Sequence, residues 1–270
     1  MNLDQFYTKK EISLDLYNKI SEIINIENYF LFEPSAGTGS FSNLFHKNSL
    51  AIDLDPKSSL IIEEDFLEFN NNYFKNKKVI TIGNPPFGQN STLAVKFFNK
   101  ASEYSEYIAF ILPKTFKKDS FINKLNINMH LIKEVELNGK NFIYNNKEKE
   151  VKTVFQIWQK KKVKRKKIDI KKESLFFKYV KKEDADFAIR RIGDLSGKII
   201  KKFNKYSENS HLYIQCKENI NKENFYNKFD IIYKEFKEKS NEVAGTPSIS
   251  KSEIIKIYER IYNDKIKEIL

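Results

Sequence analysis

Along the first 160 positions, short runs of apolar residues alternate with segments in which apolar residues have helical spacing. Short apolar runs predict strands over 29–32, 49–52, 60–62, 79–82 and 107–112. Two alternating runs predict further strands over 131–137 and 153–158, joined by a polar loop over 138–150. Helical spacing predicts amphipathic helices over 11–25 and 92–104, and a short helix near 120–125. Strands that alternate with helices indicate a mostly parallel sheet, in which ligands bind at the carboxyl ends of the strands.

The first strand leads into a segment of small residues, Glu33-Pro34-Ser35-Ala36-Gly37-Thr38-Gly39. Apolar positions at 41, 44 and 45 predict an amphipathic helix directly after it. A glycine turn between a strand and a helix lets the backbone approach a nucleotide closely, so this segment is a candidate cofactor site. The third glycine of the dinucleotide fingerprint is absent, because Ser42 stands in its place, and this argues against NAD.

Two later strands end in acidic residues. Asp53 closes the strand over 49–52, where a carboxylate can accept hydrogen bonds from ribose hydroxyls. Asp65 follows the strand over 60–62 and can accept from the amino group of an adenine ring, with Phe66 covering the face of that ring. Each acid alone also fits an ordinary turn at a strand end. Because parallel strands end at one edge of a sheet, the shared position favours a single nucleotide site.

A rigid polar motif, Asn84-Pro85-Pro86-Phe87, follows the strand over 79–82. Proline cannot continue a strand and fixes φ, so two prolines hold the preceding Asn84 in place. The side-chain oxygen of Asn84 and the carbonyl of Pro85 can then accept both hydrogens of a planar amino group and draw its nitrogen toward a nucleophilic geometry. Phe87 can stack on a flat substrate. The alternative is a proline-rich turn without a chemical role.

Composition limits the class of protein. The chain has 270 residues, of which 40% are hydrophobic and 31% charged, and its mean hydropathy is −0.57. No apolar run reaches the roughly 20 residues that span a bilayer, and the N-terminus has no signal-peptide pattern, so we expect an intracellular, cytoplasmic protein. A single cysteine, Cys216, excludes an intramolecular disulfide, and the three scattered histidines predict no metal site.

The net charge is +12, with the excess concentrated after residue 146, and the isoelectric point is about 9.3. This asymmetry favours a polyanionic partner, nucleic acid first and an anionic membrane surface second. A lysine bias from an AT-rich genome is the alternative. The basic run over 160–167 predicts a linker, a solvated loop or, in a eukaryotic host, a nuclear localisation signal. We therefore expect a catalytic domain over 1–160 and a smaller basic region over 161–270, with a helix from about residue 250.

With these residues in view, the first ~160 positions resemble the S-adenosylmethionine-dependent N6-adenine methyltransferases that carry the cofactor motif before the catalytic motif. The similarity rests on five segments in order: Phe6-Tyr7-Thr8, residues 33–39, Asp53, Asp65-Phe66 and Asn84-Pro85-Pro86-Phe87. It implies an α/β fold, a Rossmann-like, seven-stranded, mostly parallel sheet of the class I methyltransferase type with a reversed last strand. It also implies S-adenosylmethionine as the cofactor.

The resemblance assigns a role to each matching residue. Catalysis falls to Asn84, Pro85, Pro86 and Phe87. Cofactor contacts fall to Tyr7, Thr8, Glu33, Pro34, Ala36, Gly37, Gly39, Asp53, Asp65, Phe66 and Asn84, with Glu33 and Thr8 at the methionine end. A further aromatic residue should hold the flipped target base, and the candidates are Trp158 and Phe142. Arg190 and Arg191 are candidate substrate contacts in the basic region.

The substrate stays open at this stage. DNA is favoured, because the order of motifs followed by a separate basic region resembles modification methyltransferases. RNA adenine fits the same motifs. Glutamine-amide methylation of a protein uses a similar planar amide, but that group usually has Tyr where Phe87 stands and needs no basic region of this size. A nucleic-acid-binding protein with an inactive methyltransferase fold is the remaining alternative.

Overall fold

A computed structural model describes residues 6–218 and 221–267 of the chain. It divides into two compact units, Met1–Ile168 and Asp169–Leu270.

The first unit contains three helices and ten strands among its described residues. The helices are α1 (Lys10–Ser21), α2 (Thr92–Tyr104) and α3 (Asp119–Ile122). The strands are β1 (Tyr7–Thr8), β2 (Phe30–Glu33), β3 (Ser49–Asp53), β4 (Ile62–Glu63), β5 (Val79–Gly83), β6 (Ser105–Pro113), β7 (Met129–Leu137), β8 (Phe142–Tyr144), β9 (Lys147–Lys149) and β10 (Thr153–Lys160).

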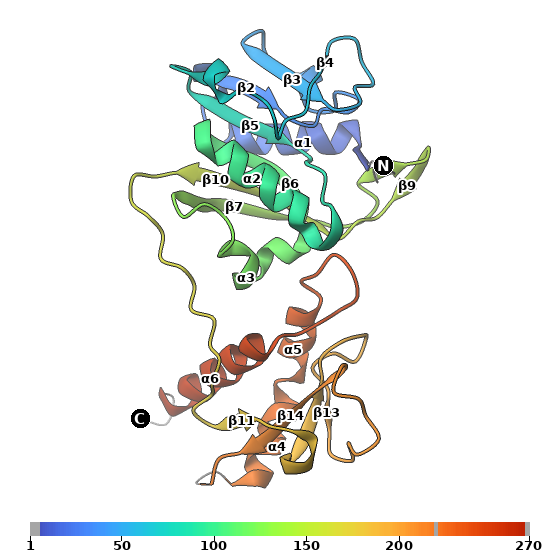
Figure 1. Cartoon of the computed structure of the whole chain (residues 1–270), viewed down its shortest axis with the longest axis vertical. Coiled ribbons are helices and arrows are strands. Elements are labelled where there is room, and N and C mark those ends of the chain that lie inside the picture. Colours follow the sequence, from blue (N-terminus) through green and yellow to red (C-terminus); the bar gives the residue numbers. More distant parts are fainter. Residues whose placement is uncertain (1–5, 219–220, 268–270) are drawn as a thin grey trace. The chain divides into compact units, whose positions relative to one another are not determined.

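Seven of these strands form one sheet in the order β4-β3-β2-β5-β6-β10-β7 (Figure 1). Strands β4, β3, β2, β5 and β6 pair in parallel, whereas β10 is antiparallel to both of its neighbours. The predicted α/β fold with seven mostly parallel strands is confirmed, including the reversed last strand along the chain. Because β10 runs backwards, it starts at the carboxyl edge of the parallel strands and ends at their amino edge.

Alternate residues of each central strand pack against opposite faces of the sheet, as the pleat requires. In β6, Phe110 belongs to the cluster that includes Phe98 of α2, and Ile111 belongs to the cluster that includes Leu16 of α1. Figure 1 accordingly shows α2 in front of the sheet and α1 behind it. The near-continuous apolar sequence of β6 follows from burial on both faces.

Two sequence predictions for this unit were wrong. The residues after Gly39 form a single 3-10 turn, Ser42–Leu44, in place of an amphipathic helix, because the chain must enter β3 at Ser49. The predicted polar loop over 138–150 contains β8 and β9, which pair as a hairpin. Asn145 and Asn146, with φ of 49° and 59°, connect the two strands, and this is the backbone conformation of a tight hairpin turn.

The second unit has a four-stranded sheet in the order β11-β14-β12-β13. Its elements are β11 (Phe177–Tyr179), β12 (Phe187–Arg190), β13 (Ile199–Ile200), β14 (His211–Cys216), α4 (Lys222–Ile231), α5 (Tyr233–Ser240) and α6 (Lys251–Lys267). An aromatic cluster that includes Phe177, Phe187 and Phe229 joins the sheet to the helices. Strands β14 and β12 are the central strands of this sheet, and the helix expected from about residue 250 is α6.

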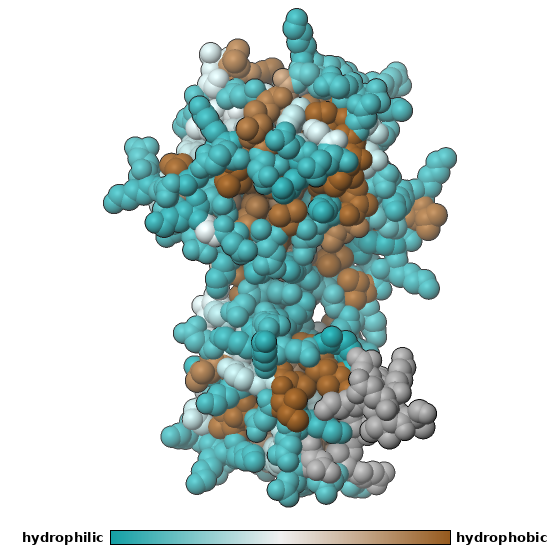
Figure 2. Space-filling view, turned by 180° about the vertical axis from the view of Figure 1, so that it is seen from behind, coloured by the Kyte–Doolittle hydropathy of each residue, from teal (hydrophilic) through white to brown (hydrophobic). Residues whose placement is uncertain are grey.

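Hydrophilic side chains predominate on the face drawn in Figure 2, with smaller hydrophobic areas on each unit. Within the described residues, no helix combines the length and the apolar character that a membrane span requires.

Candidate cofactor and catalytic site

The carboxyl edge of the large sheet brings most of the predicted site residues together. Glu33, Asp53 and Gly83 are the last residues of β2, β3 and β5, which are neighbours in the sheet. The glycine segment follows Glu33, and the Asn84 motif follows Gly83. This edge is therefore the place where the cofactor motif and the catalytic motif meet.

The glycine segment is tied down by backbone hydrogen bonds to β3. Ala36 N donates to Ile52 O at 3.0 Å, and Gly37 N donates to Oδ2 of Asp53 at 2.7 Å. Gly37 has φ of 52°, and a Cβ at this position would lie 2.8 Å from Cε1 of Tyr7. Only glycine therefore allows both this turn and the close packing of the Tyr7 ring.

Glu33 is buried, with 2% of its surface exposed. Its Oε2 accepts a hydrogen bond from Ser42 N at 2.7 Å, so the carboxylate connects the end of β2 to the turn after the glycine segment. Burial raises the pKa of Glu33 to about 8, and the nearby charge of Asp53 adds to this increase. With this pKa the group is mostly protonated at neutral pH, and a positively charged ligand group beside it would favour the charged form.

Asn84 is oriented by the N-terminal segment. Its Nδ2 donates to Phe6 O at 2.8 Å, while Ser35 Oγ donates to the backbone carbonyl of Asn84 at 3.2 Å. The Oδ1 atom is buried and has no hydrogen-bond partner within the described part of the chain. A buried, unpaired oxygen is costly, which makes it a marked acceptor for a ligand N–H.

Thr8 supplies a second acceptor of the same kind. Its hydroxyl oxygen is buried and likewise lacks a partner among the described residues, and its backbone carbonyl accepts from Ser40 Oγ at 2.8 Å. Strand β1, which contains Tyr7 and Thr8, pairs with β8, so the N-terminal segment is fixed between the glycine segment and the β8–β9 hairpin.

The predicted nucleoside residues lie on the same edge with different exposures. Asp53 is half-buried, and its Oδ1 also accepts from Asp55 N at 2.8 Å. Asp65 is exposed, and its Oδ1 accepts from Leu67 N at 2.8 Å. Phe66 is 2% exposed and packs in the core with Phe32 and Phe97. In the structure as it stands, Phe66 therefore presents almost no surface to a ring.

The remaining residues of the glycine and proline motifs are packed to different degrees. Pro34, Ala36, Gly39 and Pro85 are buried, whereas Pro86 and Phe87 are half-buried. Phe87 packs against the core cluster on the α2 face, and its carbonyl accepts from Leu93 N and Ala94 N at 3.2 Å each. The motif thus runs from the end of β5 directly into α2, with its aromatic ring partly available.

The predicted base-stacking residues do not offer a free ring. Trp158 is 1% exposed, pairs with Ile108 in the amino half of β6 and donates from its indole nitrogen to Oε1 of Gln156. It is a core residue that the structure does not bring to the site. Phe142 pairs with Thr8 but is completely buried. Its neighbour Tyr144 is half-buried and lies with its ring centroid 5.0 Å from that of Phe6.

Arg190 and Arg191 lie in the second unit, at the end of β12. Arg190 Nε donates to Ile192 O at 3.0 Å, and both residues are half-buried. The guanidinium of Arg190 is thus part of the second unit's own structure, whereas Nε of Arg191 is buried without a hydrogen-bond partner among the described residues.

Sequence reasoning missed the residues that orient the site. Ser42 N, Ser35 Oγ and the Phe6 carbonyl hold Glu33 and Asn84, and backbone atoms leave no signal in a sequence motif. Lys57 was also missed. Its backbone N donates to Gly37 O at 2.9 Å, and its ammonium pairs with Asp55 at 2.5 Å.

These residues fit S-adenosylmethionine by the chemistry of their atoms. Of the unpartnered buried atoms, Oδ1 of Asn84 is an acceptor and the Thr8 hydroxyl can accept or donate, and Glu33 and Asp53 add acidic groups beside the glycine turn. Such a set suits a ligand that is rich in N–H and O–H donors and carries positive charge. Across the described residues, no three His, Cys, Asp or Glu side chains gather in a way that would hold a metal ion.

No protein-family model matches the chain, and no curated protein matches it. Solved structures do. The chain is similar to a candidate RNA methyltransferase of Pyrococcus horikoshii, with 21% identity and a TM-score of 0.45 over 58% of this chain and 88% of the other. It is also similar to a candidate class I S-adenosylmethionine-dependent methyltransferase of Listeria monocytogenes, with 16% identity and a TM-score of 0.41 over 64% and 65% of the two chains.

A third similar structure is a candidate methylase of Haemophilus influenzae, with 17% identity and a TM-score of 0.35 over 56% of this chain and 96% of the other. At these identities and TM-scores, the similarity adds nothing about substrate or activity. The strand order of the large sheet, with its reversed strand β10, agrees with the class I methyltransferase fold that the sequence resemblance implied.

Proposed function

We propose that this protein is an S-adenosylmethionine-dependent methyltransferase that methylates the N6 amino group of adenine in nucleic acid, with DNA as the favoured substrate. The observation that carries the proposal is the orientation of Asn84. Its Nδ2 is occupied by the Phe6 carbonyl, so its buried Oδ1 is left as an acceptor at the carboxyl edge of the sheet. An amino group with two hydrogens matches this acceptor.

When bound, S-adenosylmethionine supplies a methyl group attached to a positively charged sulfur. In this proposal Glu33 and Thr8 hold its methionine end, and Asp53 and Asp65 accept hydrogen bonds from its ribose and adenine. The Gly37 turn, which only glycine can adopt against Tyr7, lets the backbone come close to this ligand.

The part that this chain plays in the reaction is positioning. Oδ1 of Asn84 accepts one hydrogen of the target amino group, and the carbonyl of Pro85 accepts the other. With S-adenosylmethionine bound, these two acceptors would direct the nitrogen lone pair toward the methyl group that the cofactor would supply, and the surplus proton of the nitrogen would leave for water. Alignment of this kind can account for about 7–11 kcal/mol of a barrier.

A target adenine in a duplex must leave the base stack to reach Asn84, which costs a few kcal/mol. In this proposal the half-buried ring of Phe87, three residues after Asn84, offsets part of this cost by stacking on the base. Lysine-rich surfaces supply affinity for the phosphate backbone, which is independent of sequence and sensitive to salt.

The test is methyl transfer from labelled S-adenosylmethionine to duplex DNA, single-stranded DNA and total RNA in parallel, with the products digested to nucleosides and identified by mass. We expect N6-methyl-deoxyadenosine. N6-methyladenosine from RNA alone would replace DNA by RNA as the substrate. Absence of label from all three pools would overturn the proposal, and label in added protein would replace it by amide methylation.

A further inference from the structure

Positive charge is distributed unevenly over the first unit. Residues 1–159 contain 19 Lys and Arg and 19 Asp and Glu, so this part of the chain has no net charge. Residues 160–167, which we call the basic strip, add seven positive charges and no negative one. The whole excess charge of the catalytic unit therefore lies in one short segment.

The basic strip is held on the surface of the first unit by its backbone. Lys161 N donates to Asn128 O and Arg165 N to Ile127 O, both at 2.8 Å, and Val163 O accepts from His130 Nε2 at 2.8 Å. Strand β10 pairs with β7 as far as Lys160, so the strip continues directly from the sheet at its amino edge. The segment that the sequence predicted as a linker or a solvated loop is thus held by hydrogen bonds to the first unit.

The end of the strip is fixed as firmly as its start. The guanidinium of Arg165 donates to the carbonyls of Ile122 and Leu125. Beyond it, Ile168 N donates to Oδ1 of Asn123 at 2.9 Å, while Nδ2 of Asn123 donates to Ile168 O at 2.7 Å. Because the backbone is already ordered, a ligand that binds the strip does not have to order it.

Five lysines of the strip are free to bind a partner. Their side chains are exposed, and no acidic group of the described structure forms an ion pair with any of Lys161, Lys162, Lys164, Lys166 and Lys167. Lys160 differs, because its ammonium donates to the carbonyls of Ser102 and Glu103 at the end of α2. Exposed, unpaired cations on an ordered backbone suit a row of anions.

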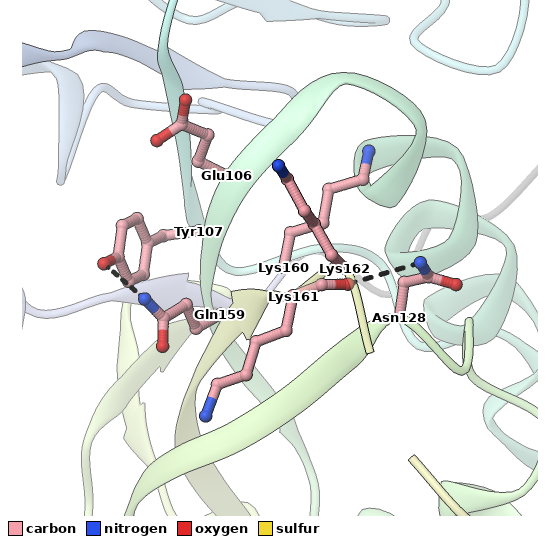
Figure 3. Close-up of a pocket in the computed structure, with 7 residues that line it drawn as sticks. All are labelled: Glu106, Tyr107, Asn128, Gln159, Lys160, Lys161 and Lys162. Carbon is pink, nitrogen blue, oxygen red and sulfur yellow. Dashed lines mark hydrogen bonds between the residues drawn. The ribbon is translucent and has the colours of Figure 1, made fainter. Parts of the chain in front are cut away.

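A recess of about 350 Å³ lies at the start of the strip (Figure 3). It is lined by Glu106, Tyr107, Asn128, Gln159, Lys160, Lys161 and Lys162. Figure 3 shows the three lysine side chains leaving the chain in different directions around it. Gln159 Nε2 donates to the Tyr107 hydroxyl at 2.8 Å, so these two polar groups of the wall are already hydrogen-bonded to each other. Glu106 is its acidic lining residue.

We propose that the basic strip is a binding surface for the phosphodiester backbone of a nucleic acid, on the amino edge of the sheet. Strand β6, with nine residues, separates this edge from the carboxyl edge by about 30 Å. Along B-form DNA this distance corresponds to about nine base pairs. The strip therefore contacts the nucleic acid at a distance from the nucleotide that reacts.

A nucleic acid fits the strip better than a membrane surface does. Val163, 74% exposed, is the large apolar side chain that the strip offers. Stable attachment to a lipid surface needs apolar side chains that insert between headgroups as well as charge. Five unpaired lysines without such an apolar face match the phosphate row of a nucleic acid.

The test compares two full-length variants with equal changes in charge. In the strip variant, Lys161, Lys162, Lys164, Lys166 and Lys167 are each replaced by Gln. In the control variant, five exposed lysines of the neutral body are replaced by Gln, namely Lys47, Lys75, Lys78, Lys96 and Lys133. Binding is measured with duplex DNA and RNA of about 30 base pairs over a series of salt concentrations, and with vesicles that contain anionic lipid.

We expect the dissociation constant of the strip variant to rise at least about 100-fold at ~0.1 M salt, and the slope of log K against log salt to fall by about four. The control variant should change by less than about threefold. Equal losses in both variants would show a general charge effect and overturn the proposal, as would a loss confined to vesicle binding. Unchanged binding of S-adenosylmethionine in both variants reports that the fold is intact.

The identity of the partner rests on the proposed function, but the two can fail separately. If the wild-type protein transfers no methyl group to any nucleic acid while the strip variant loses binding, the proposed reaction is wrong and the binding surface stands. If methyl transfer is found and the two variants bind alike, the reaction stands and the binding surface is wrong.

Discussion

The two edges of the large sheet carry polar groups in opposite ways. At the carboxyl edge, Glu33 and the Oδ1 of Asn84 are buried, and each residue is held by a specific backbone atom. At the amino edge, the backbone of the basic strip is held, but its lysine side chains extend into solvent.

This difference corresponds to two tasks. A group that must align a reacting atom needs a fixed side chain, because a small displacement is costly in rate. A group that attracts phosphates needs charge and reach, and a mobile ammonium serves as well as a fixed one. We therefore expect substitutions at the carboxyl edge to have large effects individually, and substitutions in the strip to act by their number.

The largest single effect should come from Asn84→Ala. Loss of the oriented Oδ1 should lower the rate of methyl transfer about 100- to 1,000-fold, with cofactor binding near normal. Asn72→Ala, an exposed asparagine of the same unit, is the matched control. The rate is measured at saturating cofactor. A variant that keeps a tenth or more of the wild-type rate would remove Asn84 from its assigned role.

Glu33→Gln tests, through the pH dependence of stability, whether Glu33 is a buried titrating group at the carboxyl edge. The pKa of Glu33 is raised to about 8 in the folded chain, against 4.5 for an unperturbed group. The folded protein thus keeps a proton that the unfolded chain has lost, so stability should fall as pH rises through this window. As pH rises from 5 to 8, the unfolding free energy of the wild type should therefore fall by on the order of a few kcal/mol more than that of the Gln variant.

The measurement is denaturant unfolding of both proteins at pH 5 and at pH 8. The dependence on pH should be weaker in Glu33→Gln, because its amide does not titrate. Equal changes in the two proteins between these values would show that Glu33 is not the buried titrating group.

Gly37→Ala tests how tightly the carboxyl edge is packed. The substitution combines an unfavourable φ of 52° with a contact of 2.8 Å to Tyr7, and should cost about 2 kcal/mol or more in unfolding free energy. Gly139→Ala is the control, since its φ is 85° but nothing lies within 4 Å of the added Cβ. It should cost only about 1 kcal/mol.

In a Tyr7→Ala background, Gly37→Ala should cost no more than Gly139→Ala, because the contact is gone. If the cost stays unchanged, the Tyr7 ring is not what requires glycine at this position.

The smallest effect concerns the length of the substrate. Replacing the five strip lysines should raise the KM of an unmethylated duplex of about 30 base pairs roughly tenfold more than the KM of one of about 10 base pairs with the target adenine at its centre, since the short duplex then extends only about five base pairs to either side of Asn84 and does not reach the strip. Steady-state kinetics with both duplexes checks this. Equal increases in KM would place the strip beside the target and not at the opposite edge.

Sequence patterns predicted the elements that packing makes obligatory. Helix α2 has its predicted bounds, 92–104. Its apolar residues have helical spacing, and the strands before and after it limit where the helix can begin and end. The turn after Gly39 was predicted as a helix because Phe41, Leu44 and Phe45 have helical spacing, and the short distance to β3 outweighed that pattern. The β8–β9 hairpin was missed although Asn145-Asn146 is a recognisable turn signal.

The site shows the same division. Site residues at strand ends, such as Asp53, could be predicted from the sequence, because parallel strands end at the same edge of a sheet and bring their last residues together. The contacts that orient the site come from backbone atoms of Phe6 and Ser42, and a sequence motif does not show which backbone atoms a side chain will contact. Trp158 was a reasonable candidate by residue type, but the reversed direction of β10 places it in the core near the amino edge.

The most direct measurement compares Asn84→Ala with the five-lysine strip variant in two assays. One assay is methyl transfer at saturating nucleic acid. The other is the dissociation constant of a duplex of about 30 base pairs, which is about three helical turns. We predict that Asn84→Ala loses methyl transfer and keeps duplex affinity, whereas the strip variant loses duplex affinity and keeps cofactor binding. If either variant loses both methyl transfer and duplex affinity while cofactor binding persists, catalysis and duplex binding are not assigned to separate edges of the sheet, and the account is contradicted.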